Sequence, residues 1–216
     1  MNETGRVEAF SDGVFAIAIT LLVLEIDVPH VDGGESLWSA LGDQWPSYLA
    51  YVVSFLVIGI MWANHHTVFG YLARVDRVLV FCNLLLLLVI AALPWPTALV
   101  AEYLDTGGRQ AEVAIAVYCG FMVAHAATFQ LFWWYVTRTG RLFHAWVDPE
   151  GARATRARFA LGSVAYPVSF GLAFVAPLAT VVLLGLLAVY YAFNQVAVPS
   201  RAEREQDAVP EQGGAR

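Results

Sequence analysis

Long apolar runs constrain this chain more than any other feature. Of its 216 residues, 59% are hydrophobic and only 14% are charged, whereas soluble domains carry about 25% charged residues. A helix that crosses the hydrocarbon core of a bilayer needs about 20 predominantly apolar residues. A chain of this length can therefore supply several spans with short connections. We expect an all-α integral membrane protein with no large soluble domain.

Six segments are long and apolar enough to be predicted as transmembrane helices. They cover about residues 7–28, 45–71, 78–101, 111–136, 159–175 and 178–198. We expect these spans to form one transmembrane domain over residues 1–198, followed by a disordered tail over residues 199–216. Pro94-Trp95-Pro96 is expected to interrupt the third span. The first span is not predicted to be a cleaved signal peptide, since it lacks a small-residue cleavage site before Pro29.

The positive charges predict the orientation in the membrane. All twelve basic side chains are arginines. Eleven of the twelve fall on alternate connections and at the two ends of the chain, and only Arg109 falls on the other side. Because cytoplasmic loops carry the excess of Lys and Arg, this pattern places both termini in the cytoplasm.

A narrow apolar stripe follows the first span. At about 100° per residue, five side chains share one line of a helix: Phe10, Ile17, Leu21, Leu24 and Val28. Thr20 lies at the shoulder of this stripe, and Asp12 points to nearly the opposite side. The stripe can pack against neighbouring helices, as most aliphatic stripes do, or it can line an ion pathway and form its constriction.

Several polar residues within the spans need partners in lipid. Asp12 follows Ser11 near the start of the first span, where it could also favour the helix dipole in the first turn. The second span carries four residues on one broad face: Trp62, His65, His66 and Phe69. We expect Asp12, one histidine and Asn83 of the third span to form a mainly structural network. In an alternative role, a histidine would sense protons, because its charge can change near neutral pH.

The remaining polar patterns predict little chemistry. The chain has no G-x-S-x-G, H-E-x-x-H or P-loop motif, so an enzyme is not expected. His65 and His66 point about 100° apart and lack spaced companion ligands, which makes a metal or haem site a minor alternative. Glu25 and Asp27 end the first span on the outer side. With Asp32, Glu35 and Asp43 of the following loop, they form either an acidic mouth that concentrates cations or an ordinary solvated loop.

The first three spans contain several distinctive motifs. The first span reads Arg6-x-x-x-Phe10-Ser11-Asp12, followed by Ala16, Thr20-Leu21-Leu22, Glu25 and Pro29. Later stretches are Trp62-x-x-His65-His66-x-x-Phe69, then Asn83 and Pro94-x-Pro96-Thr97. These motifs resemble the transmembrane protein 175 family, the lysosomal and prokaryotic cation channels that conduct potassium. The resemblance covers about residues 6–97, while the later spans match only in hydropathy and number.

The resemblance implies an architecture and roles for individual residues. A prokaryotic member would be a homotetramer of six-span subunits in the plasma (inner) membrane, with first helices lining a central pore. Ile17 would form the hydrophobic constriction, Leu21 and Leu24 the next layers, and Thr20 a layer linked to cation selectivity. The resemblance also implies a buried structural network, formed by Arg6, Phe10, Ser11, Asp12, Trp62, His65, His66 and Asn83.

The predicted function is therefore that of a potassium-permeable cation channel without a cofactor. The chain lacks the T-V-G-Y-G filter, so its selectivity would not come from rings of backbone carbonyls. Its expected partners are other copies of itself, the lipid bilayer and permeant monovalent cations. One alternative is a proton-permeable channel or proton-coupled transporter that uses His65, His66 and Asp12. Further alternatives are an intramembrane haem or redox protein and a non-conducting structural protein.

Overall fold

The structure is a computed structural model that describes residues 3–31, 36–193, 198 and 200. Over these residues the chain is built from helices, as its hydropathy predicts. The elements are α1 (Glu3–Leu21), η1 (Leu22–Glu25), α2 (Leu37–Asp43), α3 (Trp45–Gly70), α4 (Arg77–Ala91), α5 (Pro94–Tyr103), α6 (Gly108–Thr139), α7 (Pro149–Ala154), α8 (Arg156–Leu172) and α9 (Pro177–Ala192). Asp32, Glu35 and the predicted disordered tail apart from Ser200 lie outside the described residues; Ser200 forms an isolated antiparallel bridge with Val147.

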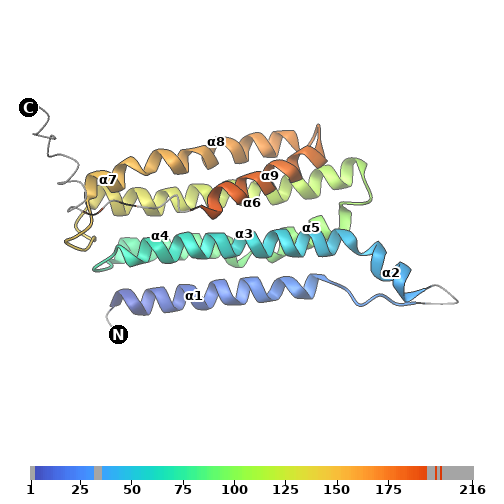
Figure 1. The fold of residues 1–216 in the computed structure, drawn as a ribbon, viewed down its shortest axis with the longest axis horizontal. Helices are drawn as coiled ribbons and strands as arrows, with labels where there is room; N and C mark the ends of the chain where they lie inside the picture. The colour runs from blue at the N-terminus through green and yellow to red at the C-terminus, as the bar shows by residue number, and fades with distance from the viewer. Residues whose placement is uncertain (1–2, 32–35, 194–197, 199, 201–216) are drawn as a thin grey trace, which may run out of the picture.

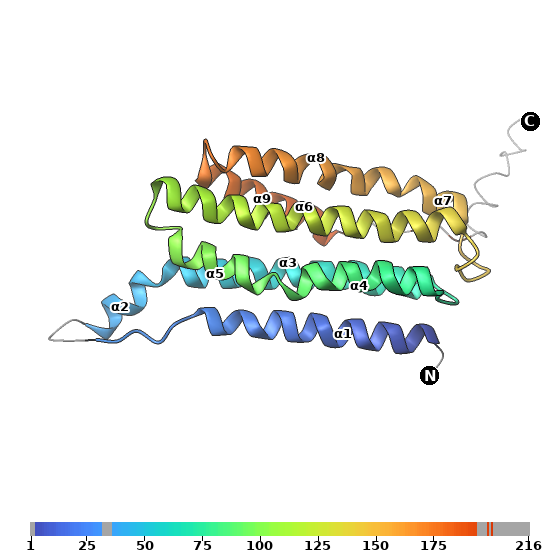
Figure 2. The same cartoon turned by 180° about the vertical axis from the view of Figure 1, so that it is seen from behind.

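The long helices lie side by side, and successive ones run in opposite directions (Figure 1). Helix α1 forms one outer edge of the bundle and packs on α3 and α4. Helix α8 forms the opposite edge against α6, and Figure 2 shows the same order from behind. Helix α1 therefore has packed neighbours on one side only, which leaves its other side open.

Four segments are long and apolar enough to cross a membrane: Glu3–Glu25, Trp45–Gly70, Arg77–Tyr103 and Gly108–Thr139. They correspond to the first four predicted spans. Helices α8 and α9 occupy the last two, but they have only 17 and 16 residues. At 1.5 Å per residue they are about 24–26 Å long, slightly shorter than a hydrocarbon core of about 30 Å.

The first span differs from its prediction at its outer end. The α-helix ends at Leu21, a 3₁₀ turn covers Leu22–Glu25, and Ile26 is already extended. Proline disfavours a helical conformation in the residue before it, so Pro29 keeps Val28 out of a helix. The stripe predicted on one continuous α-helix therefore holds only as far as Leu21. Leu24 belongs to the 3₁₀ turn, and Val28 lies beyond it.

The third span breaks where its prolines predict. Helix α4 ends at Ala91 and α5 begins at Pro94, with Pro94 and Pro96 both in its first turn. A first-turn N–H has no partner within its helix, so proline loses no hydrogen bond there. The break lies next to the buried Leu93, in the interior of the subunit.

The connector after α6 is fastened to the connector between α3 and α4. The Ala73 N–H donates to the Leu142 carbonyl at 2.9 Å, and the His144 N–H donates to the Tyr71 carbonyl at 3.0 Å. Asp76 caps α4 by accepting from the Leu79 N–H at 2.9 Å. These contacts hold the two connectors together at the end of the bundle where α1 begins (Figure 1).

Candidate functional site

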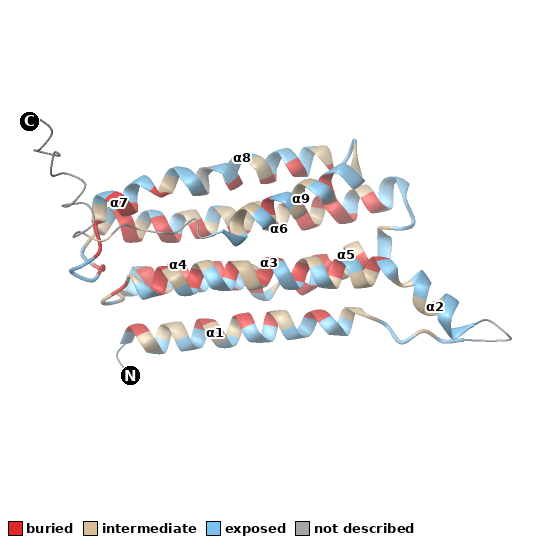
Figure 3. Ribbon diagram, in the orientation of Figure 1, coloured by how far each residue is buried: buried red, intermediate tan, exposed pale blue. Residues whose placement is uncertain are grey.

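The open side of α1 is almost entirely apolar. Phe10, Ile17 and Leu24 are 57%, 61% and 70% exposed, whereas Phe15, Ala18 and Leu22 on the packed side are buried. Figure 3 shows this division along α1, with its buried residues toward the bundle. Phe10, Gly13, Ile17, Thr20 and Leu24 follow one another at alternating spacings of three and four residues. On α1 this spacing forms a stripe from Phe10 to Thr20 that a second helix can contact, and Leu24 of the 3₁₀ turn is exposed beyond it.

Thr20 brings a polar atom onto this apolar face. The Thr20 hydroxyl is exposed and donates to the carbonyls of Ala16 at 2.8 Å and Ile17 at 3.0 Å. Its proton is used within the helix, so its oxygen presents lone pairs to the open side. Leu21, at 40% exposure, lies on the flank of the same face.

A chain of buried hydrogen bonds fixes the packed side of α1. The Asn83 amide nitrogen donates to Ser11 Oγ at 2.9 Å, and Ser11 donates in turn to the Val7 carbonyl at 2.9 Å. His65 Nε2 lies 2.8 Å from Asn83 Oδ1. Since an amide oxygen only accepts hydrogen bonds, Nε2 carries the ring proton. One polar chain therefore joins α1, α4 and α3.

The His65 ring is held among aromatic side chains. It is fully buried and stacks on Phe69, with ring centroids 4.6 Å apart, while Phe15 and Phe132 lie within 5.3 and 6.1 Å. His65 Nδ1 has no hydrogen-bond partner among the described residues. The orientation of the ring is thus set by its single bond to Asn83 and by the rings around it.

Asp12 is bonded differently from what we expected. It is half-buried and accepts a hydrogen bond from Trp62 Nε1 at 2.9 Å, so the prediction that it bonds a histidine and Asn83 is wrong. Ser11 occupies that place instead, because its neighbouring position turns it directly toward α4. His66 stacks on Trp62 and pairs with Glu8 at 3.0 Å. The two adjacent histidines therefore belong to two separate polar groups.

Two residues that were predicted to be buried in this network lie outside it. Arg6 and Phe10 are exposed and line an open groove between α1 and α4, together with Glu3, Arg77 and Leu84. Phe10 is therefore not buried with Ser11 inside the subunit. It lies on the open face, three residues before Gly13.

The outer acidic residues are only partly described. Glu25 is half-buried at the end of η1, while Asp27 and Asp43 are exposed. These residues lie at the end of the bundle opposite the N-terminus (Figure 1). In the described part of the chain, no group of three or more His, Cys, Asp or Glu side chains converges as a metal site.

A second buried polar cluster was missed by sequence reasoning. Thr97 Oγ1 lies 2.8 Å from Ser54 Oγ, which in turn lies 3.3 Å from the Tyr118 hydroxyl. This cluster joins α5, α3 and α6 close to the break in the third span. A hydroxyl residue inside each of three apolar spans was the available signal, since each one needs a partner in lipid.

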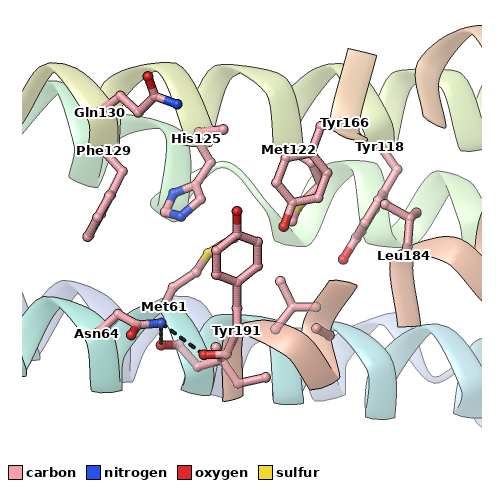
Figure 4. Close-up of a pocket in the computed structure, with 14 residues that line it drawn as sticks. Met61, Asn64, Tyr118, Met122, His125, Phe129, Gln130, Tyr166, Leu184 and Tyr191 are labelled. Carbon is pink, nitrogen blue, oxygen red and sulfur yellow. Dashed lines mark hydrogen bonds between the residues drawn. The ribbon is translucent and has the colours of Figure 1, made fainter. Parts of the chain in front are cut away.

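A cavity adjoins this cluster between α3, α6, α8 and α9 (Figure 4). Its polar side chains include Asn64, Tyr118, His125, Tyr166 and Tyr191. Asn64 Nδ2 donates to the Ile60 and Tyr191 carbonyls at 3.1 and 3.3 Å, which tethers α9 to α3. His125 of α6 also faces this cavity.

Comparison with known proteins identifies the family. The sequence profile described as "Endosomal/lysosomal potassium channel TMEM175" matches residues 6–94. A potassium channel of Streptomyces collinus is 66% identical over 201 residues, which is 93% of this chain and 97% of that protein. The chain belongs to the TMEM175 family.

The match to the TMEM175 family extends to three dimensions. The crystal structure of a lysosomal potassium-selective channel TMEM175 homolog from Chamaesiphon minutus superposes with a TM-score of 0.80 at 43% identity. That alignment covers 91% of this chain and all of the other one. The chicken protein named "Endosomal/lysosomal proton channel TMEM175" is 40% identical over 137 residues, which cover 60% of this chain and 27% of the chicken protein.

These matches confirm the resemblance seen in the sequence. The family profile ends at Pro94, close to the limit of the motifs read from the first three spans. It therefore includes α1 and the Ser11–Asn83–His65 chain. Helices α6 to α9 fall outside the profile but within the alignment to the bacterial relatives, because that alignment covers nearly the whole chain.

Proposed function

We propose that this subunit assembles as a homotetramer and forms a potassium-permeable cation channel lined by four copies of α1. The observation that carries the proposal is the open face of α1, a continuous apolar stripe on a helix with packed neighbours on one side only. A contiguous exposed apolar surface on a membrane helix needs lipid or another helix as its neighbour. The potassium channels among its bacterial relatives support the second choice.

Ile17, Leu21 and Leu24 form the hydrophobic constriction in this proposal. Four branched side chains at each level cannot replace the hydration shell of a cation, so they close the pathway by narrowing and dewetting it. Ile17 and Leu24 are separated by roughly 12 Å along the axis, because the rise is about 1.5 Å per residue as far as Leu21 and about 2.0 Å per residue in the 3₁₀ turn. The pathway conducts when the helices tilt or rotate far enough for water to enter between the rings.

Thr20 is the proposed contact for selectivity. Its hydroxyl oxygen is exposed on the stripe between Ile17 and Leu24, and its proton is already bonded within the helix. Four such oxygens around the axis would offer a cation a polar ring within an apolar pathway. The channel needs no cofactor in this scheme, and permeant potassium ions are its only small ligands.

We also propose an orientation and an outer vestibule. The described arginines other than Arg109 lie toward the end of the bundle that holds the N-terminus, which supports a cytoplasmic location for this end. Glu25 and Asp27 then lie at the outer mouth, where negative charge raises the local concentration of cations. The expected location is the plasma membrane of a prokaryote.

Potassium flux from liposomes tests this function. We expect protein alone to release potassium, and we expect Ile17→Asn to raise the resting leak because an amide at the constriction can be hydrated. Leu186→Asn provides a matched control, since Leu186 is exposed on α9 away from α1. An unchanged leak in Ile17→Asn, or an equal increase in both variants, would count against the constriction.

Proton permeation is the second candidate. His66 Nδ1 lies 3.0 Å from a carboxylate oxygen of Glu8 on the partly exposed seam between α1 and α3, which puts a histidine and a carboxylate close to the proposed pore. The chicken relative is named as a proton channel, which supports the same possibility. Collapse of a pH gradient in potassium-free liposomes, abolished by His66→Gln, would favour this function over potassium conduction.

A further inference from the structure

Three arginines gather at the end of α6, on the side of the bundle away from α1. Arg138 belongs to the last turn of α6, Arg153 to α7 and Arg156 to the start of α8. Figure 1 shows this end of α6 with α7 and α8, across the bundle from α1. None of the three contributes to the proposed pore.

Hydrogen bonds hold two of the three guanidinium groups, those of Arg153 and Arg156, beside Thr137. Arg153 Nε donates to the Thr137 carbonyl at 3.2 Å, and Arg156 Nε donates to Thr137 Oγ1 at 2.6 Å. Arg156 Nη2 also donates to the Trp134 carbonyl at 3.2 Å. Arginines at a helix C-terminus commonly satisfy its last carbonyls, and this role accounts for part of the arrangement. Each guanidinium has five N–H donors, and these bonds use only a few of them.

Within the part of the chain that the structure describes, the three charges have no carboxylate partner. Among the described residues, no carboxylate oxygen lies within 4 Å of these guanidinium groups. The like charges of Arg153 and Arg138 both act on Arg156, which is itself half-buried. By contrast, Arg141 in the same connector pairs with Asp76 at 3.1 Å. The cluster therefore repels itself and would be stabilised by an anion.

Apolar side chains adjoin these charges. The Arg138 guanidinium lies over the Trp134 ring, 4.9 Å from its centroid, and this ring is 42% exposed. Leu131, one turn earlier on the same face of α6, is also exposed. Tryptophan is enriched where a membrane protein crosses the headgroup region. A charged site that continues into an exposed apolar strip matches a ligand with an anionic head and an acyl chain.

We propose that Arg138, Arg153 and Arg156 bind the phosphate of an anionic phospholipid in the cytoplasmic leaflet, with Trp134 and Leu131 against its acyl chain. Arginine suits this role because its planar fork matches the oxygens of a phosphate. The assignment to the cytoplasmic leaflet follows the orientation proposed above, where anionic lipids attract basic clusters beside a span. The site itself does not depend on the channel function.

Native mass spectrometry of the whole protein in detergent provides the test. Purified protein is titrated with phosphatidylglycerol, with phosphatidylcholine of the same acyl chains, and with inorganic phosphate. The test variant is Arg138→Gln/Arg153→Gln, which leaves Arg156 and its bonds to α6 in place. The control variant is Arg74→Gln/Arg77→Gln, which removes the same charge from exposed positions at the same end of the bundle.

We expect phosphatidylglycerol to bind more tightly than phosphatidylcholine and to lose affinity about thirtyfold in the test variant, since each basic residue contributes about a factor of five near an anionic surface. The control variant should change its affinity less than twofold. If the test variant does not fold, the single variant Arg138→Gln replaces it, because Arg138 contacts the Trp134 ring and makes none of the bonds to Thr137. Its affinity for phosphatidylglycerol is expected to fall about fivefold.

Three results would overturn the proposal. Equal losses in test and control variants would show attraction by general charge only. Equal binding of phosphatidylcholine would remove the role of the anionic head. Inorganic phosphate that binds as tightly as phosphatidylglycerol would make the site one for free phosphate and not for lipid.

Discussion

Replacing Asn83 by Leu tests the buried chain that sets the rotation of α1. Asn83 is buried and bonds Ser11 on one side and His65 on the other, at 2.9 and 2.8 Å. Leucine has nearly the same size, so the change removes hydrogen bonds without opening a large cavity. Its main effect is to leave the Nε2–H of the buried His65 without an acceptor.

The magnitude follows from that unpaired donor. A buried polar group without a partner costs about 1–3 kcal/mol, and an interhelical hydrogen bond in a membrane protein contributes about 0.6 kcal/mol on average. We therefore expect Asn83→Leu to lower the free energy of unfolding by about 2–3 kcal/mol. For a chain of this length, that corresponds to a fall of roughly 4–12 °C in Tm.

A double variant distinguishes the loss of the His65–Asn83 hydrogen bond from a general destabilisation of the fold. His65→Phe alone should also destabilise, because it leaves the Asn83 side chain without its histidine partner. In His65→Phe/Asn83→Leu both polar groups are gone, and the new ring lies among Phe15, Phe69 and Phe132. We expect the double variant to recover at least half of the lost stability, since removing both partners of a bond can be nearly neutral.

The Tm of the unaltered protein, the two single variants and the double variant is measured in the same detergent, with size-exclusion chromatography after heating to detect the loss of folded protein. Losses that simply add in the double variant would refute a direct bond between the two side chains. An Asn83→Leu protein as stable as the unaltered one would refute the chain as a structural element.

Three further perturbations test other parts of the molecule. Thr20→Ala should reduce discrimination between potassium and sodium, and equal reversal potentials before and after would remove Thr20 from the selectivity layer. Asp12→Ala should lower assembly by freeing Trp62 Nε1, measured as the tetramer fraction on size exclusion; a changed ion preference with assembly intact would contradict its structural role. Burial raises the pKa of Asp76, but hydrogen bonds from Tyr135, the Leu79 N–H and Arg141 outweigh it and hold the pKa below its ordinary value of 3.8. Asp76 therefore stabilises the fold above about pH 4 and loses this effect as the pH falls through its folded pKa. The difference in Tm between the unaltered protein and Asp76→Asn should then become smaller in acid. A difference that grows in acid would contradict the lowered pKa of Asp76.

The sequence predicts the membrane helices well because lipid imposes a simple rule. Every backbone polar group within the hydrocarbon must be satisfied internally, so each long apolar run has to be helical. The break at Pro94-Trp95-Pro96 was equally predictable, because proline removes a backbone donor. The open face of α1 follows from its 3.6-residue period, which places Phe10 and Ile17 on one side and Ser11 on the other.

Other features depend on how helices meet, which periodicity does not describe. A helical wheel shows that Ser11 and Asp12 point about 100° apart, but it does not show which of them meets Asn83. That choice depends on the rotation of α4 and α3 relative to α1. The 3₁₀ turn at Leu22–Glu25 was missed because an apolar run is compatible with either hydrogen-bonding pattern.

The short helices show what local signals can contribute. Helix α7 begins at Pro149 and is capped by Asp148, which accepts from the N–H groups of Glu150 and Gly151. An aspartate followed by proline is a standard start signal for a helix, so this element could have been predicted. Helix α2 follows Ser36, a residue type common before a helix, but makes no side-chain cap bond, and its 7 residues are too few to show a helical period.

The central claim is that copies of α1 meet at a shared axis with Ile17 facing the ion pathway. The most direct test is potassium flux from liposomes that contain Ile17→Cys in a Cys82→Ser/Cys119→Ser background, measured before and after Cd²⁺ is added. We predict block of the flux in this protein and no block when the cysteine replaces Leu186 on α9. Flux that Cd²⁺ leaves unchanged in Ile17→Cys, or block that is equal at both positions, would contradict the claim.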